Sequence, residues 1–149
     1  MADHKAEQIM DAVVAKLTGL ATTGANITRG RVYNIEAQAL PHLSIYRGEN
    51  RPVADADQNM AFSDWILVIN IEATVKSATT QIDKTLAQIE KEVTIALKAD
   101  RTQGLAFVID TMEAGSSEPN LDGDGDQPTG SMTMQFSFKY RRSITDPSQ

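Results

Sequence analysis

The chain contains no cysteine among its 149 residues. It therefore cannot build a disulfide framework, a thiolate nucleophile, or a zinc or iron–sulfur site with cysteine ligands. No apolar run approaches the roughly 18–20 residues of a membrane-spanning helix, so we expect no membrane segment. A chain of this length is typical of one domain with a core of its own. We predict a single domain over residues 1–149.

Basic residues are missing from a long part of the chain, because no Lys or Arg lies between Thr102 and Phe138. The acidic residues of this segment are Asp110, Glu113, Glu118, Asp122, Asp124 and Asp126. Removing these six from the 20 acidic residues leaves 14 acidic against 14 basic residues elsewhere, so the segment accounts for the whole net charge of −6. Tight binding of DNA or RNA needs a basic face. The charge distribution therefore disfavours nucleic-acid binding.

Catalytic motifs are absent as well. The sequence has no GxSxG, Walker A, GxGxxG or HExxH motif, and its two histidines, His4 and His42, fall in different predicted elements. Such a pair is more often a surface and a loop histidine than a catalytic or metal pair. No spacing selects one pair among the carboxylates. We therefore expect no enzyme activity, no catalytic residues and no cofactor.

Two segments have the apolar spacing of amphipathic helices. The stripe of the first comprises Ile9, Val13, Leu17 and Leu20, and that of the second comprises Ile82, Leu86, Ile89, Val93 and Leu97. We expect Asp3 to cap the first helix and Thr80 with Asp83 to form a capping box in the second. Gly104 is a suitable C-terminal stop for the second helix.

The remaining apolar segments alternate as strands do. The predicted strands are residues 27–34, 43–47, 64–76, 105–113 and 131–142. In the last, we expect inward side chains from Met132, Met134, Phe136, Phe138 and Tyr140. Ile66 and Val68 imply that the first half of the third strand is covered on both sides. In the fourth strand, one face comprises Leu105, Phe107 and Ile109. Residues 48–61 are predicted to form a polar loop. The order favours an α+β domain, whose mostly antiparallel sheet has two main helices packed on one face and a long acidic hairpin loop.

That hairpin loop, NLDGDGDQPTG at 120–130, begins like a calcium-binding loop. Its three aspartates are Asp122, Asp124 and Asp126. They fit positions 1, 3 and 5 of an EF-hand, but Gln127 and Thr133 stand where Gly and Glu are required. A looser divalent site, with Glu118 added, is one interpretation. A solvated, charged hairpin tip is the other, and we favour it and predict no metal site.

Arg141 and Arg142 end the last predicted strand. Alternation places Arg142 on the face of Phe138 and Tyr140, where a charge needs a partner or a route to water. One interpretation is a strand end that reaches solvent, and the other is an ion pair between subunits. The polar residues 143–149 are predicted to form a flexible tail, free or bound by a partner.

Several longer segments follow one another with a characteristic spacing. They read IMDAVVAKLTGL, RGRVYNIEAQALPHLSIYRGEN, DWILVINIEATVK, IEKEVTIALKADRTQGLA and MQFSFKYRRSITDP. In order and spacing, they resemble the tail terminator and minor tail proteins of long-tailed bacteriophages. The resemblance covers essentially the whole chain. Its most specific pieces are RGRVY with LPHLSIYRGE, the helix end EVTIALKAD and the terminus FKYRRSITDP.

The resemblance implies a virion structural protein that is assembled in the host cytoplasm and lies at the head-proximal end of the tail. Such proteins form a ring, expected here to be a homo-hexamer, on the end of the tail tube. The ring stops tube polymerisation and presents a surface to the head-completion or neck protein. DNA passes through its lumen without specific binding, and concentrated negative charge suits such a conduit because it repels phosphate.

Charged residues in three places are therefore candidates for contacts with a neighbouring subunit, the tube or the lumen. They are Arg51, Asp55 and Asp57; Glu118, Asp122, Asp124 and Asp126; and Arg141 and Arg142. We expect residues 114–130 to face the lumen or the tube, and residues 48–61 to contact a neighbour or the tube. Two alternatives remain: a head–tail connector or neck component, and, in a different class, a divalent-cation-dependent binding module.

Overall fold

The computed structural model describes residues 2–30, 40–53, 61–76, 81–123 and 128–149. Its elements, in chain order, are α1 (Lys5–Leu17), β1 (Ile27–Arg29), β2 (His42–Pro52), β3 (Phe62–Lys76), α2 (Ile82–Lys98), β4 (Val108–Ser116), β5 (Asn120–Asp122) and β6 (Thr129–Ser143). The strands form one six-stranded sheet in the order β1–β2–β3–β6–β4, and β5 pairs with β6. Among the described pairs, only β1–β2 is parallel. The predicted α+β class with a mostly antiparallel sheet is thus confirmed.

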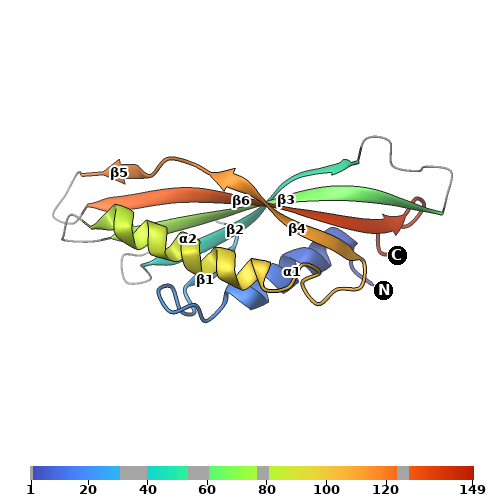
Figure 1. Ribbon diagram of the computed structural model, residues 1–149, viewed down its shortest axis with the longest axis horizontal. Helices are drawn as coiled ribbons and strands as arrows, with labels where there is room; N and C mark the ends of the chain where they lie inside the picture. Colours follow the sequence, from blue (N-terminus) through green and yellow to red (C-terminus); the bar gives the residue numbers. More distant parts are fainter. Residues whose placement is uncertain (1, 31–39, 54–60, 77–80, 124–127) are drawn as a thin grey trace.

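β3 and β6 form the long axis of the molecule. Each has 15 residues, and they pair along their full length, from Phe62 opposite Ser143 to Lys76 opposite Thr129. The sheet twists strongly about its centre, and α1 and α2 both lie against the same face of it and contact each other (Figure 1). Both helices therefore cover one face of an elongated sheet, as predicted.

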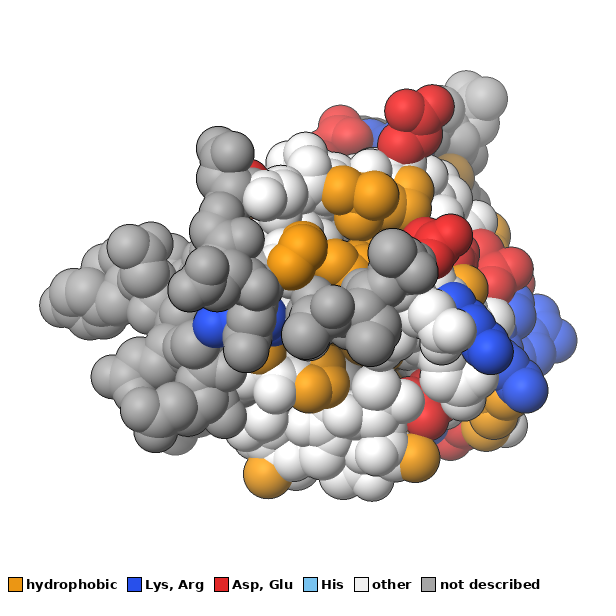
Figure 2. Space-filling view, turned by 90° about the vertical axis from the view of Figure 1, so that its left-hand side faces the viewer, with side chains coloured by type: hydrophobic (Ala, Val, Ile, Leu, Met, Phe, Trp, Pro, Cys, Tyr) orange, Lys and Arg blue, Asp and Glu red, His pale blue; other side chains and the backbone are white. Residues whose placement is uncertain are grey.

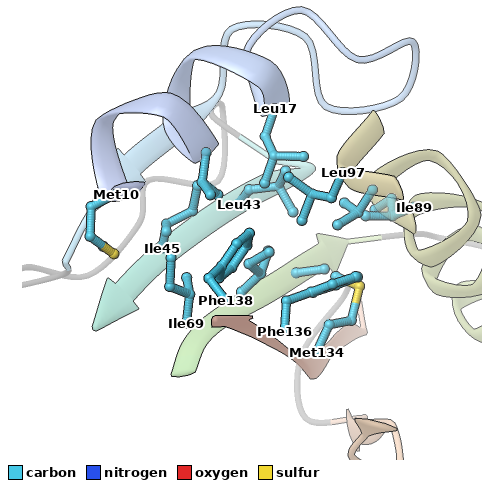
Figure 3. Close-up of a cluster of buried hydrophobic side chains, with 14 of the residues drawn as sticks. Met10, Leu17, Leu43, Ile45, Ile69, Ile89, Leu97, Met134, Phe136 and Phe138 are labelled. Carbon is cyan, nitrogen blue, oxygen red and sulfur yellow. The ribbon is translucent and has the colours of Figure 1, made fainter. Parts of the chain in front are cut away.

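The core fills the space between that face and the helices. In Figure 3, side chains from α1, α2, β2, β3 and β6 meet in one cluster. Alternate residues of the two long strands point into it, and those of β6 are the five predicted: Met132, Met134, Phe136, Phe138 and Tyr140. Burying a side chain of leucine or phenylalanine size contributes about 1.5–3 kcal/mol, so this layer dominates the stability of the fold.

The opposite face of the sheet differs from the prediction. Ile66 and Val68 are half-buried, and neither described helix lies over them. Their neighbours across the strand pair are Lys139 and Ser137. The apolar part of a lysine side chain can shield such a residue while its ammonium stays in water. Two apolar residues on the outer face therefore did not require a second layer.

β2 also differs, because it continues through the residues predicted to begin a polar loop. The segment GENRP lies in β2, and the pairing with β3 resumes at Asn50 after an irregularity that follows Arg47. Gly48 fits there because a Cβ would lie 2.9 Å from the Asn70 Nδ2 atom. Pairing with a long neighbouring strand has overridden the local polarity.

The helix ends are set by residues other than those predicted. His4, not Asp3, caps α1: its Nδ1 accepts a hydrogen bond from the Ala6 backbone N at 2.9 Å. The N-cap of α2 is Gln81, without a side-chain hydrogen bond; Thr80 lies outside the described residues. α1 ends at Leu17, before Leu20.

The end of α2 is closed by a buried glutamine rather than by Gly104. The Gln103 Nε2 donates to the Leu97 backbone O at 2.7 Å, and also to the Thr111 Oγ1 at 2.9 Å. Gln103 is buried and has a φ of 54°, a value that is uncommon without glycine. This side chain joins the end of α2 to β4.

Ile109 faces outward because of an irregularity in β4. Val108 pairs with Tyr140 and Asp110 with Lys139, so Ile109 is an extra residue in a bulge of β4. A bulge shifts the alternation of a strand by one residue. Val108 is accordingly buried, whereas Ile109 is 39% exposed.

Candidate functional site

The two ends of the sheet carry different chemistry. One end, called the acidic end here, holds Glu118, Leu121 and Asp122 around β5. The other, called the terminal end, holds the start of α1, the start of β3 and the end of β6. In Figure 1 they lie at opposite ends of the long axis.

At the terminal end, Arg142 is held within the chain. Its guanidinium lies 3.5 Å from the centroid of the Trp65 ring, and its Nη1 is 3.1 Å from the Nε2 of His4. Register accounts for this arrangement, because Trp65 pairs with Tyr140 and Arg142 follows on the same face. Stacking on tryptophan gives an arginine a partner without full exposure to water.

His4 connects this stack to α1. Burial, followed by the positive charges of Arg142 and Arg47, lowers the pKa of the His4 imidazole. Its Nδ1 must be unprotonated to accept the hydrogen bond from the Ala6 N. The neutral form of His4 is therefore the one that caps the helix.

Arg141 points to the other face and pairs with Asp64. The Nε–Oδ1 and Nη2–Oδ2 distances are 2.8 and 3.3 Å, a two-point contact. The hydrogen bond from Arg141 is the main reason why the pKa of Asp64 is lowered. The guanidinium of Arg141 satisfies a carboxylate of its own chain, while its side chain remains 60% exposed.

Beside this ion pair lies an open apolar groove of about 720 Å³. It is lined by Lys5, Phe62, Ala106, Phe107, Ile109 and Arg141. The Lys5 Nζ lies 4.9 Å from the Phe107 ring centroid and donates to the Arg141 backbone O at 3.0 Å. Phe62 is 49% exposed. The groove thus combines exposed apolar walls with the Lys5 ammonium and the Arg141–Asp64 ion pair.

The last residues, predicted to form a flexible tail that is free or bound by a partner, run back to the start of α1. The Lys5 backbone N donates to the Pro147 O at 2.9 Å, and the Ile144 N donates to the Ala61 O at 3.0 Å. The Asp146 carboxylate accepts hydrogen bonds from the Ser148 N and Oγ at 2.9 and 2.7 Å, closing a turn. These contacts attach the tail to the terminal end.

At the acidic end, the side chain of Leu121 is 59% exposed. It lies opposite Gly130 of β6, and a Cβ on that glycine would lie 3.0 Å from the Leu121 Cδ2 and 2.3 Å from the Ile82 Cγ2. Glycine therefore allows β5 and α2 to approach β6 closely. Figure 2 looks onto this end and shows hydrophobic side chains in the middle, with Asp and Glu side chains above and beside them and Lys and Arg side chains at the sides.

The other candidate residues are distributed as follows. Arg51 is exposed on β2, with its Nε 3.6 Å from the Glu49 Oε2. Asp55, Asp57, Asp124 and Asp126 lie outside the described residues. Within the described ranges, no group of three or more His, Asp and Glu residues is arranged to hold a metal ion. No described helix is long and apolar enough to cross a membrane.

Sequence reasoning missed the groove. Its walls come from segments far apart in the chain, and Ile109 contributes to it only because of the bulge in β4. One signal was present: Phe62 lies outside the apolar alternation of β3.

No protein-family model matches the chain, and no curated protein matches it.

Proposed function

We propose that this chain is a virion structural protein of the tail-terminator kind. Copies assemble as a ring, expected to be hexameric, on the head-proximal end of a phage tail tube. The ring stops tube polymerisation and provides the surface for joining the head through a head-completion or neck protein. The resemblance of ordered segments over the whole chain supports this role.

The observation that carries the proposal is the difference between the two ends. A part that stands between two unlike neighbours needs two unlike surfaces. Here one end of the sheet exposes Glu118 and Asp122, and the other exposes an apolar groove with Lys5 and Arg141. The β3–β6 pair runs without interruption from one end to the other.

Two further features agree with the same role. The terminus FKYRRSITDP, a specific piece of the resemblance, forms much of the terminal end, where Arg141 and Arg142 are positioned by Asp64 and Trp65. The segment between Thr102 and Phe138 has no basic residue, and a surface of that charge repels the phosphates of DNA. DNA can therefore pass such a surface without adhering to it.

The test is tube polymerisation with the purified chain. Tube subunits from the same phage are polymerised with and without it, and tube lengths and ends are measured by electron microscopy. We expect shorter tubes with a ring at one end. Unchanged tube lengths with bare ends would overturn the proposal, and a ring that binds finished tubes without limiting their growth would favour a connector.

A further inference from the structure

We propose that side chains at the end of α2 and in β4 close the β4 edge of the sheet, so that this edge cannot pair with the β4 strand of a second copy of the chain. The closing contacts, called the edge clasp here, are those of Lys98 and Asp110 with the backbone of Thr111. The inference goes beyond the proposed function and does not depend on it.

β4 lies at one edge of the sheet. It pairs with β6 on one side, and no strand among the described residues pairs with it on the other. An unpaired edge is a template for the strand of another chain. Irregularities after Val108 and after Glu113 interrupt β4, and residues 110–113 are the longest regular stretch that they leave. Pairing with a second copy would therefore begin most readily at residues 110–113.

Thr111 lies in that stretch, and both polar groups of its backbone are already occupied. Its N–H donates to the Asp110 Oδ1 and its carbonyl O accepts from the Lys98 Nζ, both at 2.9 Å. Residues of an antiparallel strand alternately direct these groups toward and away from the paired strand. The two side-chain partners identify Thr111 as a residue that faces away from β6. Because Thr111 is fully buried, an incoming strand must displace both side chains before it can pair there.

Further hydrogen bonds hold the clasp in place. The Asp110 Oδ1 also accepts from the Arg101 Nε at 3.0 Å. The Thr111 hydroxyl donates to the Arg101 backbone O at 2.8 Å and accepts from the Gln103 Nε2 at 2.9 Å. Lys98 lies in the last turn of α2, where the helix dipole favours a cation. The end of α2, the turn after it and β4 are thus joined at one residue of the edge.

Loss of the clasp should free the edge for pairing. Two copies that pair antiparallel at Thr111 exchange two backbone hydrogen bonds. These two bonds should strengthen self-association about ten- to a hundredfold. Both copies use the same edge, so the contact is two-fold symmetric and the product is a dimer.

The test compares two double variants of the full chain by sedimentation velocity, in a concentration series that reaches about 1 mM. The clasp-free variant is Lys98→Met with Asp110→Ala, which loses one basic and one acidic residue and so keeps the net charge of −6. The clasp-retaining control is Lys98→Arg with Asp110→Asn. Arginine still offers a donor to the Thr111 O, and asparagine still offers an acceptor to its N–H. Circular dichroism checks that both variants fold.

We expect the clasp-free variant to dimerise at least about tenfold more strongly than either the wild type or the clasp-retaining control. Amide hydrogen exchange locates the new contact. The protection gained as the concentration rises should fall on residues 110–113, because those residues form the paired stretch.

A second measurement tests the clasp in the monomer and needs only single substitutions. At a concentration where the chain is monomeric, the Thr111 amide should exchange about tenfold faster in Asp110→Ala than in Asp110→Asn. Asparagine keeps the acceptor that alanine removes, so this difference reports the hydrogen bond itself.

The proposal is overturned if the clasp-free variant associates no more strongly than the clasp-retaining control, or if the gained protection lies outside residues 110–113. Equal exchange rates of the Thr111 amide in the two single variants would also overturn it. If the clasp-free variant does not fold, the comparison of the single variants decides. None of these measurements involves tube polymerisation, so the inference and the proposed function can fail separately.

Discussion

β3 and β6 run through both ends of the molecule, but charged side chains have different surroundings at the two ends. At the terminal end, Arg141 and Arg142 each have a partner on a neighbouring strand, Asp64 and Trp65. At the acidic end, Glu118 and Asp122 stand in a segment without any basic residue. Charges at the terminal end therefore organise the fold, whereas the negative charge of the segment around β5 is not balanced by basic residues of that segment.

The largest effect should come from the acidic end, where packing and not charge is critical. Gly130→Val places a side chain where a Cβ alone would lie 2.3 Å from the Ile82 Cγ2. We expect a loss of about 1–3 kcal/mol in unfolding free energy, measured by denaturant titration. Gly123→Ala, which meets open space, is the control. Equal losses of unfolding free energy in the two variants would contradict the close packing of β5 and α2 against Gly130.

At the terminal end, Arg142→Met should be the most costly change of a charged residue. It keeps an unbranched side chain beside Trp65 but removes the guanidinium 3.5 Å from the ring centroid. We expect a loss of about 1–2 kcal/mol by the same titration. Arg51→Met, at an exposed strand position, should cost less. A larger cost at Arg51 would show that the stack is not what secures this end.

Asp64→Asn tests the second pair through its pH dependence. The folded-state pKa of Asp64 is lowered, so the unfolded chain binds the proton more readily. This contribution is present above the ordinary carboxyl pKa of about 3.9 and is lost as pH falls through the lowered value. We expect the variant to show a shallower loss of stability below pH 4 than the wild type. An unchanged acid limb of the thermal-unfolding profile would argue against the pair.

His4→Asn should have a smaller effect, in a different pH window. The pKa of His4 is lowered in the folded chain, so its stabilising contribution is complete above the unfolded value of about 6.5 and is lost as pH falls through the lowered pKa. Protonation removes the cap on α1 and places a cation beside Arg142. Asparagine caps without titrating. The variant should match the wild type at pH 8 and exceed it at pH 5 in thermal unfolding.

Glu118→Gln should have the smallest effect on stability. The residue is exposed at the acidic end, and an isolated surface charge contributes little to folding. We expect an unchanged unfolding midpoint, with a change only in electrophoretic mobility. A marked loss of stability would mean that the acidic end, like the terminal end, uses charge to hold its structure.

Sequence alone predicted the parts of the fold that depend on local periodicity. The alternation of β6 from Met132 to Tyr140 and the stripe of α2 are both found in the core. What failed depends on pairing between distant segments. The strand at GENRP exists because β3 continues beside it, and Ile109 turns outward because β6 sets a different register. No local pattern carries that information.

Sequence alone could identify the types of residue in the candidate site, but not which residues meet there. Arg142 was placed on the correct face from its spacing to Phe138 and Tyr140, but its partner Trp65 lies on another strand. His4 was interpreted as a surface residue, whereas it caps α1 and approaches Arg142. The groove needed the full arrangement of α1, β3, β4 and β6.

The full-length pairing of β3 with β6 also has a mechanical consequence. Tension along the long axis, applied to the start of one strand and the start of the other, acts in shear on the whole ladder from Phe62–Ser143 to Lys76–Thr129. The hydrogen bonds of an antiparallel pair lie perpendicular to the strands, so such a load is shared among them instead of opening them one by one. The domain should therefore yield at a higher force when stretched lengthwise than when its strands are peeled apart.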